Sequence, residues 1–128
     1  MLDTGIMGRQ EMTVTREDTA KVYGSGTLQV LATPRMAALM EETAWKSVAE
    51  YLEPGMGTVG TRLELDHLAP TPVGMKVLCE SVLEKVEGRK LTFSITAKDE
   101  KGEIGRAVHQ RFIVEEEKFQ NKADQKNG

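Results

Sequence analysis

The chain has 128 residues, of which 39% are hydrophobic, and its 17 lysines and arginines against 20 aspartates and glutamates give a formal net charge of −3. This length fits one domain, and the near balance of charge argues against a nucleic-acid or an anionic-membrane partner. No apolar run approaches the roughly 20 residues that a membrane-spanning helix needs, so we expect no membrane association.

The N-terminal residues and the cysteine content favour a cytoplasmic protein. Residues 1–11, MLDTGIMGRQE, lack the basic and then apolar layout of a secretion signal. Cys79 is the only cysteine, so no internal disulfide can form, and with two histidines in the chain neither a metal site nor another cofactor is expected. The hydrophobic content supports a core of modest size, which small chains of this kind often complete by forming dimers.

The first part of the chain carries weak signals for regular structure. We expect a single domain over residues 1–128, with frayed ends at 1–8 and 118–128. Residues 9–15 are a short strand candidate. Residues 15–26 mix charged residues with glycine, which is typical of a loop that contains at most a helical turn.

The pair Thr33-Pro34 predicts the start of a long helix, because threonine caps helix N-termini and proline is favoured at the first helical position. Apolar and small side chains then recur at helical spacing, and residues 53–55, Glu-Pro-Gly, end the helix. The stripe consists of Met36, Leu39, Met40, Thr43, Ala44, Ser47, Val48 and Tyr51.

Residues 58–67 alternate between two faces, a pattern typical of a half-buried strand. His67 ends the apolar face, just before a stiff Pro-rich connection at 69–74, whereas Gly60 falls with the charged side chains on the other face. A lone histidine on an apolar face is more often structural than functional, yet side chains at strand ends often line a cleft. The expected apolar face is Val59, Thr61, Leu63, Leu65 and His67.

Three further strands are expected, joined largely by hairpins. Residues 75–86 have a mixed pattern that indicates a bulge or two buried faces, and residues 89–98 alternate cleanly. Residues 104–115 form the last strand, on which Ala107, His109, Arg111 and Ile113 share one face. One long helix and about five strands predict an α+β domain with an antiparallel sheet wrapped around a central helix, the hotdog fold.

Two polar residues of the helix are candidates for chemistry. Thr33 lies where unpaired N–H groups and the positive end of the helix dipole favour a developing oxyanion, although it is equally a plain capping residue. Glu41 lies beside the apolar stripe and suits a general base; the alternative is a solvated glutamate like Glu42. Eight residues separate Thr33 from Glu41, roughly 12 Å along an ideal helix, so a substrate, a water, a distorted turn or a partner subunit must bridge them.

Arg111 and His109 are weaker candidates on the last strand. Arg111 is suited to a phosphate or carboxylate group, and the alternative is a surface charge paired with a glutamate. The chain contains no phosphate-binding loop, no zinc motif and no Gly-x-Ser-x-Gly elbow.

Several short motifs, in their order and spacing, resemble the fluoroacetyl-CoA-thioesterase-like branch of the hotdog superfamily. They are LATP at 31–34, LMEE at 39–42, YLEPG at 51–55, VGT at 59–61, DHLAPTPVG at 66–74, VEGRKL at 86–91, HQRF at 109–112 and EKF at 117–119. The resemblance implies hydrolysis of a short-chain acyl-CoA by Thr33, Glu41 and His67 at the interface of a homodimer or of a dimer of dimers. It further implies that Gly60 lies near the thioester carbonyl and that Arg111 lies in the substrate region.

One departure from the family pattern concerns substrate choice. The fluoroacetate-specific enzyme carries a longer, Phe-bearing lid before the Ala-Thr motif, whereas residues 24–30 are short and contain no phenylalanine. Fluoroacetyl specificity is therefore not expected. The sequence leaves two alternatives for the nucleophile, the Thr33 hydroxyl and a water molecule. The alternative functions are a non-catalytic acyl-CoA-binding module and a hydratase or dehydratase on the same fold.

Overall fold

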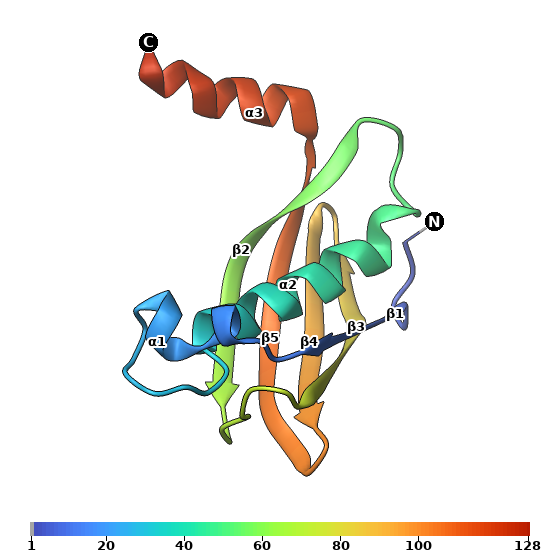
Figure 1. Ribbon diagram of the computed structural model, residues 1–128. Helices are drawn as coiled ribbons and strands as arrows, with labels where there is room; N and C mark the ends of the chain where they lie inside the picture. Colours follow the sequence, from blue (N-terminus) through green and yellow to red (C-terminus); the bar gives the residue numbers. More distant parts are fainter. Residues whose placement is uncertain (1) are drawn as a thin grey trace.

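The computed structural model describes residues 2–128 and contains a five-stranded antiparallel sheet with the strand order β1-β3-β4-β5-β2. The helix α2 (Thr33–Ala49) crosses one face of this sheet (Figure 1). The strands are β1 (Met7–Thr13), β2 (Met56–His67), β3 (Lys76–Glu87), β4 (Lys90–Asp99) and β5 (Gly102–Glu115). The α+β hotdog fold is thus confirmed, and β1 and β2 form the two edges of the sheet.

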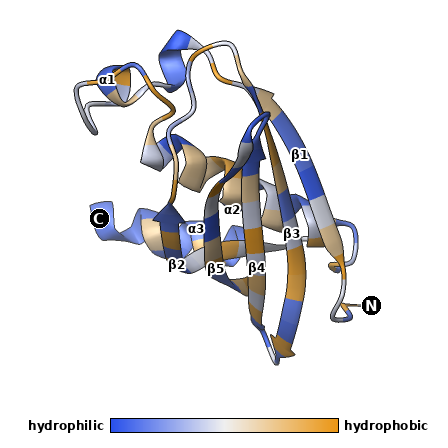
Figure 2. Cartoon of the chain, turned by 90° about the horizontal axis from the view of Figure 1, so that it is seen from below, coloured by the Kyte–Doolittle hydropathy of each residue, from blue (hydrophilic) through white to orange (hydrophobic). Residues whose placement is uncertain are grey.

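The core lies between α2 and the inner face of the sheet. Apolar and polar positions alternate along the strands, as the hydropathy colours of Figure 2 show, so each strand offers one face to the helix. The buried side chains of α2 are Met36, Leu39, Met40, Thr43, Ala44 and Val48, and β4 contributes Leu91, Phe93, Ile95 and Ala97. Both sets match the periodicity of the sequence. No helix within residues 2–128 is long and apolar enough to span a bilayer.

The start of α2 corrects one prediction. Thr33 is the first helical residue, and Ala32 occupies the cap position with an extended backbone (φ −71°, ψ 139°). The Ala32 N–H donates to the Asp18 carbonyl at 2.9 Å, which holds the preceding chain against the loop. The Thr33 hydroxyl contacts a side chain of β2 instead of capping the helix. Because Thr33 is released from capping, its hydroxyl is available for chemistry.

A β-bulge in β2 corrects a second prediction. Gly60 is opposite Arg111 and Arg62 is opposite Gln110, so Thr61 is the extra residue in β2. An extra residue exchanges the faces of all residues on one side of it. Gly60 therefore faces α2, on the same side as His67, and not the outer face that strict alternation predicted.

The chain ends are more regular than expected. The Gly5 N–H donates to the Leu83 carbonyl at 2.8 Å, which ties the first residues to β3. At the other end, α3 (Glu116–Asp124) and a 3₁₀ turn (Gln125–Asn127) replace the expected frayed tail and project away from the sheet (Figure 1). Two glutamates in the first turn of α3 and Lys122 in its last turn complement the helix dipole, which favours a helix that buries none of its side chains.

The loop before α2 contains the short turns that its sequence indicates. A 3₁₀ turn (Arg16–Asp18) and the one-turn helix α1 (Ala20–Tyr23) precede the bends of residues 24–30. Asp18 accepts a hydrogen bond from Arg35 of α2 at 3.1 Å, so the loop is fastened to the first turn of the long helix.

Candidate active site

Thr33 and His67 form a hydrogen-bonded pair at one end of α2. The Thr33 Oγ1 and His67 Nδ1 atoms lie 2.7 Å apart, so the first residue of the helix meets the last residue of β2. Burial lowers the pKa of His67 below its ordinary value, which keeps the imidazole neutral. Within residues 2–128 the other ring nitrogen, Nε2, is buried without a hydrogen-bond partner. A neutral histidine at this distance can accept the proton of the Thr33 hydroxyl or of a water.

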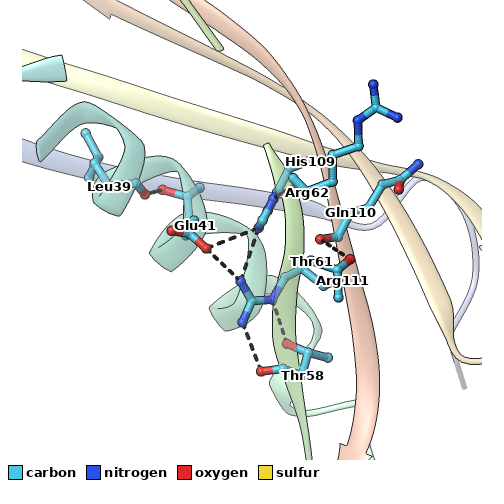
Figure 3. Close-up of polar contacts among 9 residues, drawn as sticks. Leu39, Glu41, Thr58, Thr61, Arg62, His109, Gln110 and Arg111 are labelled. Atoms are coloured by element: carbon cyan, nitrogen blue, oxygen red, sulfur yellow. Dashed lines mark hydrogen bonds and ion pairs between the residues drawn. The ribbon is translucent and has the colours of Figure 1, made fainter. Parts of the chain in front are cut away.

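Glu41 belongs to a second cluster, further along α2 (Figure 3). Its Oε2 atom lies 3.6 Å from Arg111 Nη1 and 3.9 Å from His109 Nε2. The Glu41 side chain is 43% exposed, whereas those of Arg111 and His109 are 7% and 1% exposed. The carboxylate therefore sits at the mouth of the cluster, with its cationic partner behind it.

Thr58 of β2 anchors Arg111 from the other side. The Arg111 Nε donates to Thr58 Oγ1 at 2.8 Å, and Nη2 donates to the Thr58 carbonyl at 2.9 Å. Burial lowers the pKa of Arg111, yet an arginine remains charged at any physiological pH. A surface hollow of about 510 Å³ opens over this cluster, lined by Tyr23, Arg35, Ala38, Glu41, Glu42, Trp45 and Arg111.

Gly60 leaves room for the side chains of Glu41, Arg111 and His109. A Cβ atom at this position would lie 2.5 Å from Glu41 Oε2, 3.2 Å from Arg111 Nη1 and 3.3 Å from His109 Cε1. Only a residue without a side chain lets these three groups converge on the strand. The bulge at Thr61 is what turns Gly60 towards them.

The predicted site residues thus fall into two groups. Thr33 and His67 touch each other, and Glu41, Gly60 and Arg111 surround one point. The rise of an α-helix places Thr33 and Glu41 roughly 12 Å apart, so one chain alone does not unite the two groups. Thr58 was not among the predicted candidates, and His109 was named only for its place beside Arg111. The alternation of β5 signals that His109 shares a face with Arg111, whereas Thr58 requires the register of β2 against β5, which sequence alone does not give.

In the described part of the chain, no three His, Cys, Asp or Glu side chains lie in an arrangement that could hold a metal ion. Cys79 is buried beneath α2, and burial raises the pKa of its thiol to about 11. Such a thiol is protonated at neutral pH and is a poor nucleophile.

Comparisons with known proteins identify the family of the chain. Residues 14–117 match the model of a family described as fluoroacetyl-CoA-specific thioesterase. The fluoroacetyl-CoA thioesterase of Streptantibioticus cattleyicolor is 42% identical over 98 residues, which span 77% of this chain and 70% of that protein.

Two solved structures extend the likeness to the fold. A variant of the fluoroacetyl-CoA thioesterase FlK, solved with acetyl-CoA, is 33% identical, with a TM-score of 0.94 and coverage of 99% of this chain and 100% of that one. A hypothetical protein of Thermus thermophilus, described as a thioesterase superfamily member, is 28% identical, with a TM-score of 0.91 and coverage of 99% and 94%. The resemblance read from the motifs is confirmed, and the chain belongs to the fluoroacetyl-CoA-specific thioesterase family of hotdog-fold hydrolases.

Proposed function

We propose that this protein hydrolyses short-chain acyl-CoA thioesters to the free acid and CoA, with Thr33, Glu41 and His67 as its catalytic residues. Membership of a thioesterase family supports the reaction class. The 2.7 Å contact between Thr33 Oγ1 and His67 Nδ1 is the observation that carries the assignment, because it pairs a hydroxyl with a neutral base at a helix N-terminus.

In this scheme His67 removes a proton from the attacking oxygen and returns it to the leaving thiolate. The attacking oxygen belongs to Thr33 or to a water that Thr33 orients. If Thr33 attacks, the acyl group passes from sulfur to Thr33 Oγ1, and a water deprotonated by His67 then hydrolyses this ester to the free acid. The amides at the start of α2 and the backbone of Gly60 face the developing oxyanion. Glu41 acts as a base or orients the attacking group. Arg111 holds the carboxylate in place and contacts the substrate.

We further propose that the complete site forms between two copies of the chain. β2 is an edge of the sheet, which leaves one side of its backbone open to a second strand. If two copies of β2 pair antiparallel about a two-fold axis at Glu64, with Thr61 as the extra residue of the bulge, His67 of one copy lies opposite Gly60 of the other and both face α2. This register places Glu41 of the second copy near the Thr33–His67 pair, because Glu41 lies against Gly60. The dimer, or a dimer of dimers, would thus bridge the separation along α2.

The reaction is tested with a panel of acetyl-, propionyl- and longer acyl-CoA substrates, in which released thiol is measured continuously. We expect turnover of short acyl chains. Fluoroacetyl-CoA is included as a comparison, and no preference for it over acetyl-CoA is expected because residues 24–30 contain no phenylalanine. Saturable binding of CoA esters without thiol release would indicate a binding module and contradict the proposal. Loss of enoyl-CoA absorbance would indicate a hydratase.

The shared site is tested by mixing two inactive variants, Thr33→Ala and Glu41→Gln. If the site forms between copies, a mixed dimer contains one intact site and one doubly substituted site. After subunit exchange the mixture should therefore recover about a quarter of the wild-type activity. If all three residues act within one chain, mixing leaves the activity at the level of the separate variants. Light scattering on the same samples gives the oligomeric state.

We also propose a cytoplasmic location, since CoA esters are intracellular substrates and the single thiol, Cys79, is buried and unpaired. Cell fractionation with an antibody against the protein tests this, and recovery from an extracellular or membrane fraction would contradict it.

A further inference from the structure

His109 is a buried histidine outside the proposed catalytic set, and it lies at the centre of the contacts around Arg111 (Figure 3). It is 1% exposed, and its ring centroid lies 6.2 Å from that of Phe93. Its Nδ1 atom lies 2.7 Å from the carbonyl oxygen of Arg62, and its Nε2 atom lies 3.1 Å from Arg111 Nη1. Both ring nitrogens therefore have partners inside the protein.

These two contacts require the same tautomer. A backbone carbonyl only accepts hydrogen bonds, so Nδ1 of His109 must carry the proton. A guanidinium only donates, so Nε2 must offer its lone pair to Arg111. The imidazole is then neutral. Burial lowers the pKa of His109, and the neighbouring charge of Arg111 lowers it further, in agreement with the tautomer that the geometry requires.

The acceptor on His109 completes the restraint of Arg111. Thr58 receives hydrogen bonds from Nε and Nη2, and His109 receives one from Nη1, so all three guanidinium nitrogens are held. A planar group fixed at three nitrogens cannot turn. The second hydrogen on Nη1 remains for the Glu41 carboxylate at 3.6 Å. Without His109, Nη1 would be free to move onto the carboxylate or towards solvent.

We propose that His109 is a positioning residue of the active site. As a neutral, Nδ1-protonated imidazole it fixes the Arg111 guanidinium, and through Arg111 it sets the place of the Glu41 carboxylate. The carbonyl of Arg62, directly after the β-bulge, fixes His109 in turn. The catalytic consequence rests on the proposed function, whereas the tautomer and the restraint of Arg111 do not.

The tautomer is tested without any activity. Long-range ¹H–¹⁵N spectra of the wild-type protein at about pH 7.5 report the protonation of each ring nitrogen, and a His67→Gln variant assigns the two histidines. We expect His109 to show a protonated Nδ1 and an unprotonated Nε2. An Nε2-protonated ring or an imidazolium would overturn the proposal, because neither form can accept from Arg111.

The catalytic role is tested by rescue and by coupling. His109→Gln keeps an acceptor near the Nε2 position, whereas His109→Leu removes it at similar size. We expect the Leu variant to lower kcat/KM about 10-fold or more and the Gln variant to stay within about 3-fold of wild type. In an Arg111→Ala background, His109→Leu should change kcat/KM by less than about 2-fold. Equal losses in both His109 variants, or additive losses with Arg111→Ala, would show a purely structural role.

The two tests also separate the inference from the proposed function. If wild-type protein releases no thiol from any acyl-CoA, the proposed function fails, and the spectra still decide whether His109 is the acceptor for Arg111. If the Leu variant does not fold, the spectra and the Gln variant still decide. A Gln variant that folds normally but loses about 10-fold or more in kcat/KM would overturn the proposal.

Discussion

The two groups of polar residues along α2 are built in opposite ways. At the helix N-terminus, Thr33 and His67 share one hydrogen bond, and Nε2 of His67 has no partner within residues 2–128. Eight residues further on, Glu41 faces an Arg111 side chain that is held through Thr58 and His109 at every nitrogen. The Thr33–His67 pair therefore keeps an unused hydrogen-bonding atom, whereas every guanidinium nitrogen of Arg111 has a partner.

This contrast indicates that the two groups of residues have different roles in the reaction. A group that must transfer protons has to exchange hydrogen bonds during the reaction, which suits the lightly restrained Thr33–His67 pair. A group that stabilises or orients charge works best when its dipoles are fixed in advance, which suits the Arg111 cluster. Substitutions should therefore affect the rate strongly and the stability little at the first group, and should affect both at the second.

The largest effect is expected for His67→Ala. Loss of the proton acceptor next to the Thr33 hydroxyl should lower kcat by roughly 10²–10⁴-fold. Thr33→Ala should lower kcat comparably, because the same hydrogen bond disappears. Since Thr33 is exposed and His67 only half-buried, the melting temperature of both variants should stay near that of wild type. Thiol release and thermal unfolding on the same samples provide the measurement.

Thr96→Ala is the matched control for Thr33→Ala, because Thr96 is an exposed threonine on β4, outside both groups. It should leave kcat unchanged. A Thr33→Ala enzyme that retains full kcat would remove the Thr33–His67 pair from the chemistry and would leave Glu41 as the main candidate.

A smaller loss is expected for Glu41→Gln. The amide keeps the size of the side chain but removes its charge, so kcat should fall roughly 10²-fold while Arg111 remains held by Thr58 and His109. Glu42→Gln is the matched control, since Glu42 is the next residue of the same helix and contacts Gln10 and Lys46 instead. Equal rates in the two variants would contradict a catalytic role of Glu41.

The same contrast explains how far the sequence allowed prediction. The fold followed from local patterns: the stripe of α2 and the alternation of β4 each depend on the periodicity of a single element. The Thr33–His67 contact could be anticipated because β2 follows α2 after a short turn and runs back along the helix. The last residue of β2 therefore lies near the first residue of α2. The face of Gly60 was predicted wrongly, because the bulge at Thr61 depends on pairing with β5, which no periodicity within β2 reveals. Thr58 was missed for the same reason.

An intermediate effect is expected for Gly60→Ala. The new Cβ would lie 2.5 Å from Glu41 Oε2, and the flexible carboxylate end can move away, so the fold should survive while Glu41 leaves its place. We expect kcat/KM to fall about 10-fold and the melting temperature to fall by a few degrees, because the buried Arg111 and His109 side chains, 3.2 Å and 3.3 Å from the new Cβ, must also shift. Gly57→Ala is the matched control, because its Cβ would meet the flexible Glu116 carboxylate in the same way. Similar losses in both variants would show that β2 responds to any added side chain.

The smallest effect is expected in the pH dependence of stability. Burial lowers the pKa of both His67 and His109, so the unfolded chain binds protons near pH 6.5 that the folded protein excludes. Where the unfolded state binds more protons, stability rises with pH. The stabilisation is therefore complete above the unfolded pKa and is lost as pH falls through the folded values. The melting temperature should fall by a few degrees between about pH 7.5 and 5.5.

His109→Gln and His67→Gln divide this pH effect between the two groups. Each substitution removes one titrating group, so each should flatten the pH slope by its own share. Because His109 is almost fully buried and lies beside the charge of Arg111, whereas His67 is only half-buried, the larger share should belong to His109. If His67→Gln abolishes the pH dependence of the melting temperature and His109→Gln leaves it unchanged, His67 is the more strongly desolvated histidine. That result would reverse the comparison between the two groups.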